Sequence, residues 1–321
     1  MQKLKITLAK AMIRRSVKHS DFAPAAAERN FFVDRNVPEY NNSYYFALIA
    51  PDTTAVIIRL AGRGTGEFEL WFSVNASGRG RFSVPVSFQK TVKSFEQGPL
   101  VLRCLEPERR WELAFAGDLS GENGKNVKVE FSAKLSSSYP IYHFTNDADP
   151  SLMAEGMAAE KWGREFFRTL QAMHQHHYEQ GGEAECTLSL DGKVQSMKMK
   201  FFRDHSFGPR SWDAMDRHLW MCLCLDNSDY FNLGLPEYPF IKIKAGFHAS
   251  AGGYSSLVEA PSFAEHLGQS GPPRDFTLRV RSANGSKLNI SCKRGPGFDW
   301  LMDDVYRVHE WVSDFELNGV H

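Results

Sequence analysis

The sequence lacks several features that would assign a function directly. It has no run of about 18 apolar residues, so we expect no transmembrane helix. Lys and Arg together number 38, as do Asp and Glu, and a chain without net charge is not expected to bind nucleic acid as a generic polyanion. No Gly-x-Ser-x-Gly nucleophile elbow is present. The glycine-rich stretch 62–66 lacks the Gly-Lys-Ser/Thr ending of a phosphate loop, so we interpret it as a hairpin turn.

Cysteine is also scarce. The five copies are an odd number, and their spacing forms no disulfide framework. Cys222 and Cys224 lie within the apolar run LWMCLCL, where both are typical of buried strand residues. We therefore expect reduced thiols and an intracellular, cytoplasmic location.

What the sequence does contain is period-two alternation after residue 40. The runs EFELWFSV (67–74), WELAFAG (111–117) and VKVEFSAKL (127–135) alternate apolar and polar residues, and glycine-rich turns separate them. Asp191-Gly192 and Asn284-Gly285 are two further hairpin signals in the second half of the chain. The pattern predicts a mostly β protein built from antiparallel barrels or sandwiches.

One segment is typical of a helix. Residues 149–178 are rich in Ala, Glu, Met and Leu, with Asp149 or Ser151 as the N-cap, Pro150 in the first turn and Gly181-Gly182 beyond the end. We expect this main helical segment, from about residue 150 to 178 and broken near Gly163, to divide two β-rich halves. The predicted domains are 1–178, including a basic N-terminal segment and the connecting helix, and 179–321.

Histidines gather at the end of that predicted helix. His174 and His177 are three residues apart and would share a helix face, as metal ligands do. Cationic histidines near a helix C-terminus are also favoured by the helix dipole without any metal. No zinc-type spacing with a carboxylate lies nearby, so we expect no metal site.

The N-terminal segment MQKLKITLAKAMIRRSVKHS has six Lys or Arg residues and no acidic residue. As a helix it would place Leu4, Leu8 and Met12 on one side, which is typical of a mitochondrial presequence or of a peripheral membrane contact. A simple solvated helix is the alternative that the sequence favours.

The stretch FFRDHSFGPRSW (201–212) combines a basic group, an acid and an imidazole at the end of an apolar strand-like run. Strict alternation places one face of this strand inward: Met197, Met199, Phe201, Arg203 and His205. Asp204 then points outward, unless a β-bulge intervenes. An inward Arg or His is costly to bury without a partner, so these two residues are either paired structurally or part of a site.

The same stretch resembles a known motif. Arg203–Gly208, with Arg210 and Trp212, is similar to the motif of an animal and bacterial family marked by RDHSFG. Further landmarks occur in the expected order: GPLVLRCLEPERRWELAFAG, HQHHYEQGGE and the terminal FELNG. The resemblance covers about residues 40–321. It extends distantly to the group of carotenoid 1,2-hydratases, tocopherol cyclases and fungal Diels-Alderases.

That resemblance implies two consecutive lipocalin-like antiparallel β domains, an apolar ligand cavity, and chemistry without a metal or organic cofactor. Hydratases and cyclases of the group protonate a carbon–carbon double bond with an acid in an Asp-His-Asn-Trp-Gly stretch. Asp204, His205 and Gly208 match this pattern, whereas Ser206 and Phe207 replace Asn and Trp. Sites on one scaffold diverge more freely than the scaffold itself, so the resemblance implies the fold more directly than the reaction.

The resemblance nominates Asp204 and His205 as catalytic residues. A carboxylic acid must stay neutral to protonate an alkene, which burial favours, and aromatic faces stabilise the resulting cation. If Asp204 pairs with Arg203 or Arg210 it is ionised and cannot act as the acid. We expect substrate contacts from His177, Tyr178, Phe202, Arg203, Phe207, Arg210, Trp212 and Trp220.

We therefore expect a cofactor-independent enzyme that acts on a hydrophobic small molecule, such as an isoprenoid, polyene or polyketide. The reaction would be acid/base hydration, cyclisation or isomerisation. Two alternatives stay open: a non-catalytic lipocalin-like carrier of an apolar ligand, and a structural accessory domain in which the Asp-His pair ties barrel strands together.

Overall fold

The computed structural model describes residues 2–17, 23–84, 87–90, 95–210, 214–262, 275–302 and 306–321. The chain forms two compact units. The barrel unit comprises residues 22–141 and 175–210. The terminal unit comprises residues 1–21, 142–174 and 211–321, and so contains both chain ends. Both units are mostly β, as the sequence predicts.

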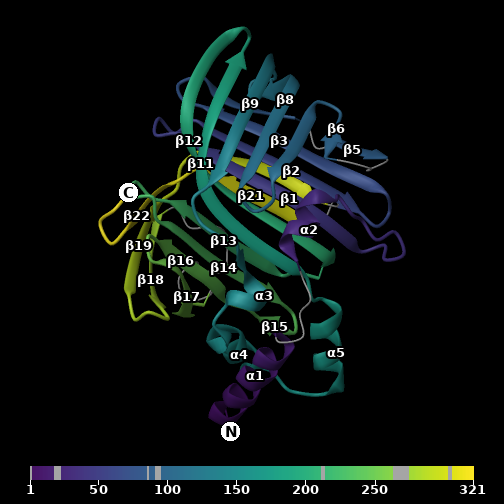
Figure 1. Cartoon of the computed structure of the whole chain (residues 1–321), viewed down its shortest axis with the longest axis vertical. Helices are drawn as coiled ribbons and strands as arrows, with labels where there is room; N and C mark the ends of the chain where they lie inside the picture. Colours follow the sequence, from purple (N-terminus) through teal and green to yellow (C-terminus); the bar gives the residue numbers. More distant parts are fainter. Residues whose placement is uncertain are drawn as a thin grey trace. The chain divides into compact units, whose positions relative to one another are not determined.

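In the barrel unit, the described strands include a closed ring of eight that pair antiparallel, each with the next (Figure 1). In ring order these are β1 (Tyr40–Ile49), β2 (Ala55–Arg63), β3 (Glu67–Ala76), β4 (Gly80–Ser83), β8 (Arg110–Gly121), β9 (Asn126–Ser137), β11 (His176–Leu190) and β12 (Lys193–Pro209). β12 pairs with β1 and closes the ring. Outside the ring lie β5 (Ser87–Lys90) on β3, and β7 (Leu100–Glu106) on β8 with β6 (Glu96–Gln97) beyond it. The short helix α2 (Pro24–Arg29) precedes β1.

Alternation in the sequence explains which side chains fill this barrel. β9 alternates buried and exposed residues along almost its whole length, with Val129, Phe131 and Ala133 inward. The β11–β12 hairpin turns at the predicted Asp191-Gly192, where both residues have positive φ (51° and 78°), as a type I′ turn requires.

Packed side chains occupy the interior of the barrel unit. Its core includes stacked Phe72 and Phe115, with ring centroids 3.8 Å apart, and Trp111 against Phe46 at 5.7 Å. A small hollow of about 30 Å³, lined by Thr54, Arg79 and others, has room for roughly one water molecule. The described core residues of this unit therefore pack closely against one another.

The strands of the terminal unit form a second, nearly closed antiparallel barrel. Its main sheet runs in the order β13 (Arg217–Cys224), β14 (Tyr230–Tyr238), β16 (Ala245–Ser250), β17 (Gly253–Glu259), β18 (Asp275–Ser282), β19 (Lys287–Lys293) and β22 (Asp314–Leu317). β15 (Ile241–Lys242) adds to β14, and β20 (Gly297–Met302) pairs with β21 (Tyr306–Trp311). The short strand β10 is Tyr142–His143. The buried core of the terminal unit includes Leu223, Phe231, Leu257 and Leu278.

The helices of the terminal unit are α1 (Gln2–Val17), α3 (Phe144–Asp147), α4 (Pro150–Ala159) and α5 (Arg164–Ala172). α4 begins as predicted, because Asp149 caps it by accepting a hydrogen bond from the Ser151 N–H at 2.8 Å. The predicted break near Gly163 is also present, since α5 starts directly after that residue. The helix does not continue to residue 178: strand β11 begins at His176. Among the described residues, no helix has the length and apolar character needed to cross a membrane.

The two units do not divide at the predicted boundary after residue 178. β11 and β12, which that boundary assigns to the second domain, pair with β9 and β1 of the barrel unit. The physical reason is ring closure: a β-barrel leaves no free edge only if its last strand returns to its first, so this hairpin belongs with strands far earlier in the sequence.

Candidate functional site

β12 carries the Arg203-Asp204-His205 triplet between two long partners. Asp204 pairs with Tyr45 of β1 and with Glu179 of β11, and His205 pairs with Tyr44 and Tyr178. The register is continuous across the triplet on both sides, so the chain forms no bulge there. Arg203 and His205 therefore point into the barrel with the core residue Phe201, and Asp204 points outward, as alternation predicts.

The burial of Asp204 differs from what its outward position suggested. Only 9% of the residue is exposed, and Arg203 and His205 are 1% and 0% exposed. A bulge was expected to be necessary for a buried Asp204. The residue is instead buried on the outward face of an unbroken strand, and a small part of its surface is accessible to solvent.

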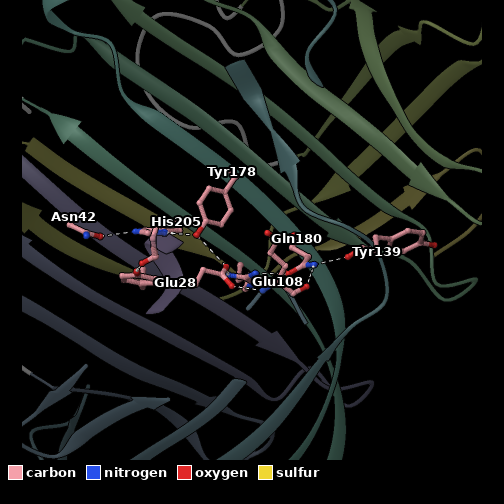
Figure 2. Close-up of polar contacts among 10 residues, drawn as sticks. Glu28, Asn42, Glu108, Tyr139, Tyr178, Gln180 and His205 are labelled. Atoms are coloured by element: carbon pink, nitrogen blue, oxygen red, sulfur yellow. Dashed lines mark hydrogen bonds and ion pairs between the residues drawn. The ribbon is translucent and has the colours of Figure 1, made fainter. Parts of the chain in front are cut away.

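His205 lies in a series of hydrogen bonds inside the barrel that runs from Asn42 through His205 and Tyr178 to Glu28 (Figure 2). Its Nε2 is 2.7 Å from Asn42 Oδ1, and its Nδ1 is 2.6 Å from the Tyr178 hydroxyl. The Asn42 amide nitrogen donates to the Phe32 carbonyl, which fixes its oxygen toward His205. Because Asn42 Oδ1 accepts, Nε2 of the imidazole carries a proton. The Tyr178 hydroxyl lies between His205 Nδ1 and Glu28 Oε1, to which it donates at 3.2 Å.

The electrostatics of this interior keep His205 neutral. Burial, with the nearby Arg203 charge, lowers its pKa well below the ordinary value of 6.5. The Tyr44 ring stacks on the imidazole with centroids 3.8 Å apart. Both ring nitrogens have partners, so His205 holds strands β1, β11 and β12 together and has no nitrogen open to a ligand.

Arg203 belongs to the same buried network, because Tyr178 contacts both His205 and the Arg203 partner Glu28. Its Nη1 lies 2.6 Å from Glu28 Oε1, and its Nε and Nη2 donate to Gln180 Oε1 at 3.0 and 2.5 Å. Gln180 in turn donates to the main-chain carbonyls of Glu108 and Tyr139, at 2.7 and 2.6 Å (Figure 2). Burial opposes the guanidinium charge, but Glu28 raises the pKa of Arg203 above its ordinary value.

Helix α2 brings Glu28 into this network. Tyr44 donates its hydroxyl proton to the carbonyl of Ala27 at 2.9 Å, which anchors the helix, and Glu28 is 0% exposed. Glu28 Oε2 accepts a hydrogen bond from the Glu108 N–H, so both carboxylate oxygens have partners. The inward half of the triplet is thus a satisfied structural ion pair, as a buried charge requires.

The outward face carries a different group of titratable residues. Glu179, directly across from Asp204, lies 2.8 Å from His177 Nε2 through its Oε1. Burial and the Glu179 charge raise the pKa of Asp204 to about 6, against the opposing influence of His177, Arg210 and Arg59. Burial also lowers the pKa of His177. On this face Asp204 is therefore an acid that holds its proton more tightly than an ordinary Asp, and His177 is an imidazole that stays neutral.

Neither neighbouring arginine neutralises Asp204. Arg203 faces Glu28 on the inward side, and Arg210 donates to Gln175 Oε1 at 3.0 and 2.6 Å and to Ser206 Oγ at 3.1 Å. Asp204 Oδ1 is buried without a hydrogen-bond partner among the described residues. Among the described residues, Asp204 therefore forms no ion pair with Arg203 or Arg210 that would keep it ionised and prevent it from acting as an acid.

The remaining predicted site residues are divided among several places. Phe202 is 1% exposed and shares the outward face with Asp204. Phe207 points inward and stacks on His176 with centroids 5.0 Å apart. Trp220 lies opposite Gly234 on β13–β14 of the terminal unit and is half-buried. Trp212 lies outside the described residues. Among the described residues, no group of three His, Cys, Asp or Glu side chains could hold a metal ion.

Sequence reasoning missed the acidic partners on both faces. Glu179 lies two residues after His177, a spacing that shares one face of a strand, but the segment was interpreted as a helix. Glu28 and Arg203 are 175 positions apart, and nothing near either residue in the sequence marks the pair.

The family model described as a domain of unknown function (DUF7064) matches residues 26–320. The chain belongs to this family. No curated protein matches the sequence.

Solved structures with the same fold share little sequence with the chain. An AttH-like protein from Nitrosomonas europaea has a TM-score of 0.57 at 9% identity, over 87% of this chain and 88% of that one. Kievitone hydratase from Nectria haematococca has a TM-score of 0.55 at 11% identity, over 94% of this chain and 89% of that one. These likenesses confirm the fold of two consecutive β-barrels that the sequence resemblance implied.

Proposed function

We propose that this protein is an enzyme that modifies a hydrophobic small molecule by proton transfer, with Asp204 as the acid. The observation that carries the proposal is the buried Asp204 carboxyl, which has no ion-pair partner among the described residues and an Oδ1 without a hydrogen bond. Ordinary structural carboxylates are paired when buried, as Glu28 and Glu69 are in the same unit. A buried carboxyl left without a partner is typical of a functional group.

The environment of Asp204 suits a proton donor. With a pKa of about 6, roughly one molecule in ten carries the proton at pH 7. Such a group is a stronger acid than water and is still protonated often enough to act. The two aromatic rings placed beside it, Phe202 on the same face and Tyr45 across β1, could stabilise positive charge that develops on a protonated double bond.

A hydration reaction can be balanced with the groups on this face. Asp204 transfers its proton to one carbon of a double bond, and a water molecule adds its oxygen to the other carbon. The water loses one proton to His177, which is neutral and lies against Glu179. That proton returns to Asp204 through solvent, so that the net change is addition of one water. The fold shared with kievitone hydratase supports a lyase of this type.

The test is turnover in deuterated water. Purified full-length protein is incubated with separate panels of isoprenoids, polyenes and polyketides in ²H₂O, and products are identified by mass spectrometry. We expect a product that carries solvent deuterium on carbon. The Asp204→Asn variant should lose this activity, because an amide cannot donate the proton.

Asp118→Asn is the matched control, since Asp118 is exposed on β8 of the same barrel unit. Loss of turnover in Asp204→Asn but not in Asp118→Asn supports the proposal. Undiminished turnover in Asp204→Asn contradicts it. Tight binding of a compound without any conversion would instead favour the carrier alternative.

A further inference from the structure

Helix α1 exposes a stripe of large apolar side chains. Leu4, Leu8 and Met12 are 65%, 47% and 44% exposed. At 3.6 residues per turn, positions four apart follow one another along one side, and these three span an arc of about 80°. Three large apolar residues aligned on one helix face are more than the scattered single exposures that a soluble surface normally carries.

The stripe is not the face by which α1 packs on its own unit. Ala9 is fully buried, and Ile6 and Ile13 pack against the cluster that contains Met157 and Phe166. Figure 1 shows α1 beside α4, in accord with their contacts. Lys5 also donates to the carbonyl of Glu160 at 2.7 Å. The helix is therefore packed against its own unit along one side, and Leu4, Leu8 and Met12 lie exposed outside that packed side.

The charges of α1 are all of one sign. The described helix contains Lys3, Lys5, Lys10, Arg14 and Arg15 and no acidic residue. Arg14 and Arg15 are exposed in the last turn, where cations are also favoured by the helix dipole. The chain as a whole has zero net charge, so this positive charge is a local feature of one helix.

We propose that α1 docks this protein on an anionic lipid surface, with Leu4, Leu8 and Met12 inserted at the headgroup boundary and the basic residues on lipid phosphates and carboxylates. An interfacial helix combines these two features, an apolar face and flanking Lys or Arg. A protein partner would need one complementary pocket for the stripe, whereas a lipid surface needs only anionic charge and accessible acyl chains. Placing a hydrophobic-substrate enzyme at such a surface would bring it to its substrate, although the docking does not depend on the proposed reaction.

The experiment is co-sedimentation of the full chain with phosphatidylcholine vesicles that contain or lack phosphatidylserine. We expect binding only to the anionic vesicles, and weaker binding as salt shortens the Debye length from about 10 Å at 0.1 M. Leu4→Gln with Leu8→Gln removes the apolar stripe without changing charge and should abolish binding. Arg14→Gln with Arg15→Gln should weaken binding about 25-fold, since each cation contributes about fivefold near an anionic surface.

Two matched controls carry the same substitutions elsewhere. Val194→Gln replaces an apolar residue that is 67% exposed, and Lys125→Gln with Lys128→Gln removes two exposed cations. Both should bind vesicles like the unaltered protein, and circular dichroism should show equal helix content in all variants. Absence of binding to anionic vesicles at low salt overturns the proposal, as does unaltered binding by the Leu4/Leu8 variant. A Leu4/Leu8 variant that turns a dimer into a monomer in sedimentation velocity, without any vesicle binding, would assign the stripe to a second copy of this chain.

Discussion

Replacing Asp204 by Asn should make the folded protein more stable at neutral pH. The pKa of Asp204 is about 6 in the folded protein, against an ordinary value of 3.8. The folded state therefore binds this proton more tightly than the unfolded state does. Between these two pKa values the unfolded chain has already released the proton while the folded chain retains it, so the free energy of unfolding falls as pH rises through this window.

The magnitude follows from the shift. A difference of about 2 pKa units, at about 1.4 kcal/mol per unit, corresponds to about 3 kcal/mol between low pH and pH 7. Asn has nearly the same shape and does not titrate. The variant should thus escape this loss, and its free energy of unfolding relative to the unaltered protein should rise by about 2.5 kcal/mol between pH 4 and pH 7.

The assay is urea unfolding of both proteins, monitored by tryptophan fluorescence at several pH values across this window. Other carboxyl groups titrate in both proteins, so the difference between the two curves isolates Asp204. Asp118→Asn, at an exposed position of the same barrel unit, is the control for the effect of the Asp-to-Asn substitution itself. A flat difference for Asp204→Asn would refute the reasoning, because it would mean that the folded protein does not raise the pKa of this carboxyl.

Three further results are expected. Turnover should fall about tenfold per pH unit above about pH 6, because only protonated Asp204 acts as the acid, and should fall again at low pH as His177 becomes protonated; a pH–rate profile that rises above pH 6 would contradict this. Glu28→Gln should lower the free energy of unfolding by about 3–5 kcal/mol in urea, because it leaves the buried Arg203 charge unpaired, and a loss below about 1 kcal/mol would show that the ion pair is not essential. Gly182→Ala should cost about 1–3 kcal/mol in the same assay, since its Cβ would lie 2.3 Å from the Ser136 carbonyl oxygen, whereas Gly252→Ala, with 3.9 Å to its nearest neighbour, should change little.

Some elements were predictable because their signals are local. The alternation in residues 127–135 became β9, and Asp191-Gly192 became the turn between β11 and β12. Asp149 and Pro150 start α4 as expected. In each case the side chains that decide the conformation lie within a few residues of one another, so the sequence contains the whole signal.

The error at residues 173–178 has a physical cause. The stretch MHQHHY has no apolar–polar alternation, and it follows a helix directly, so helix and strand were equally compatible with it. What makes residues from His176 onward a strand is the pairing of β11 with β12 and β9. These hydrogen bonds join strands that are separated along the chain, and no local pattern records them.

By itself, the sequence determined the fold class, the alternation that turns Arg203 and His205 inward and Asp204 outward, and the basic character of the first helix. Only the tertiary structure decided that both faces of the triplet are buried, that Glu28 pairs with Arg203, and that Glu179 and His177 accompany Asp204. The direction of a side chain follows from the two-residue period of a strand, which is local. The burial, the partners and the pKa of a side chain follow from the groups that tertiary structure packs around it. Glu28 comes to Arg203 from 175 positions away, and Glu179 comes to Asp204 across the β11–β12 pairing.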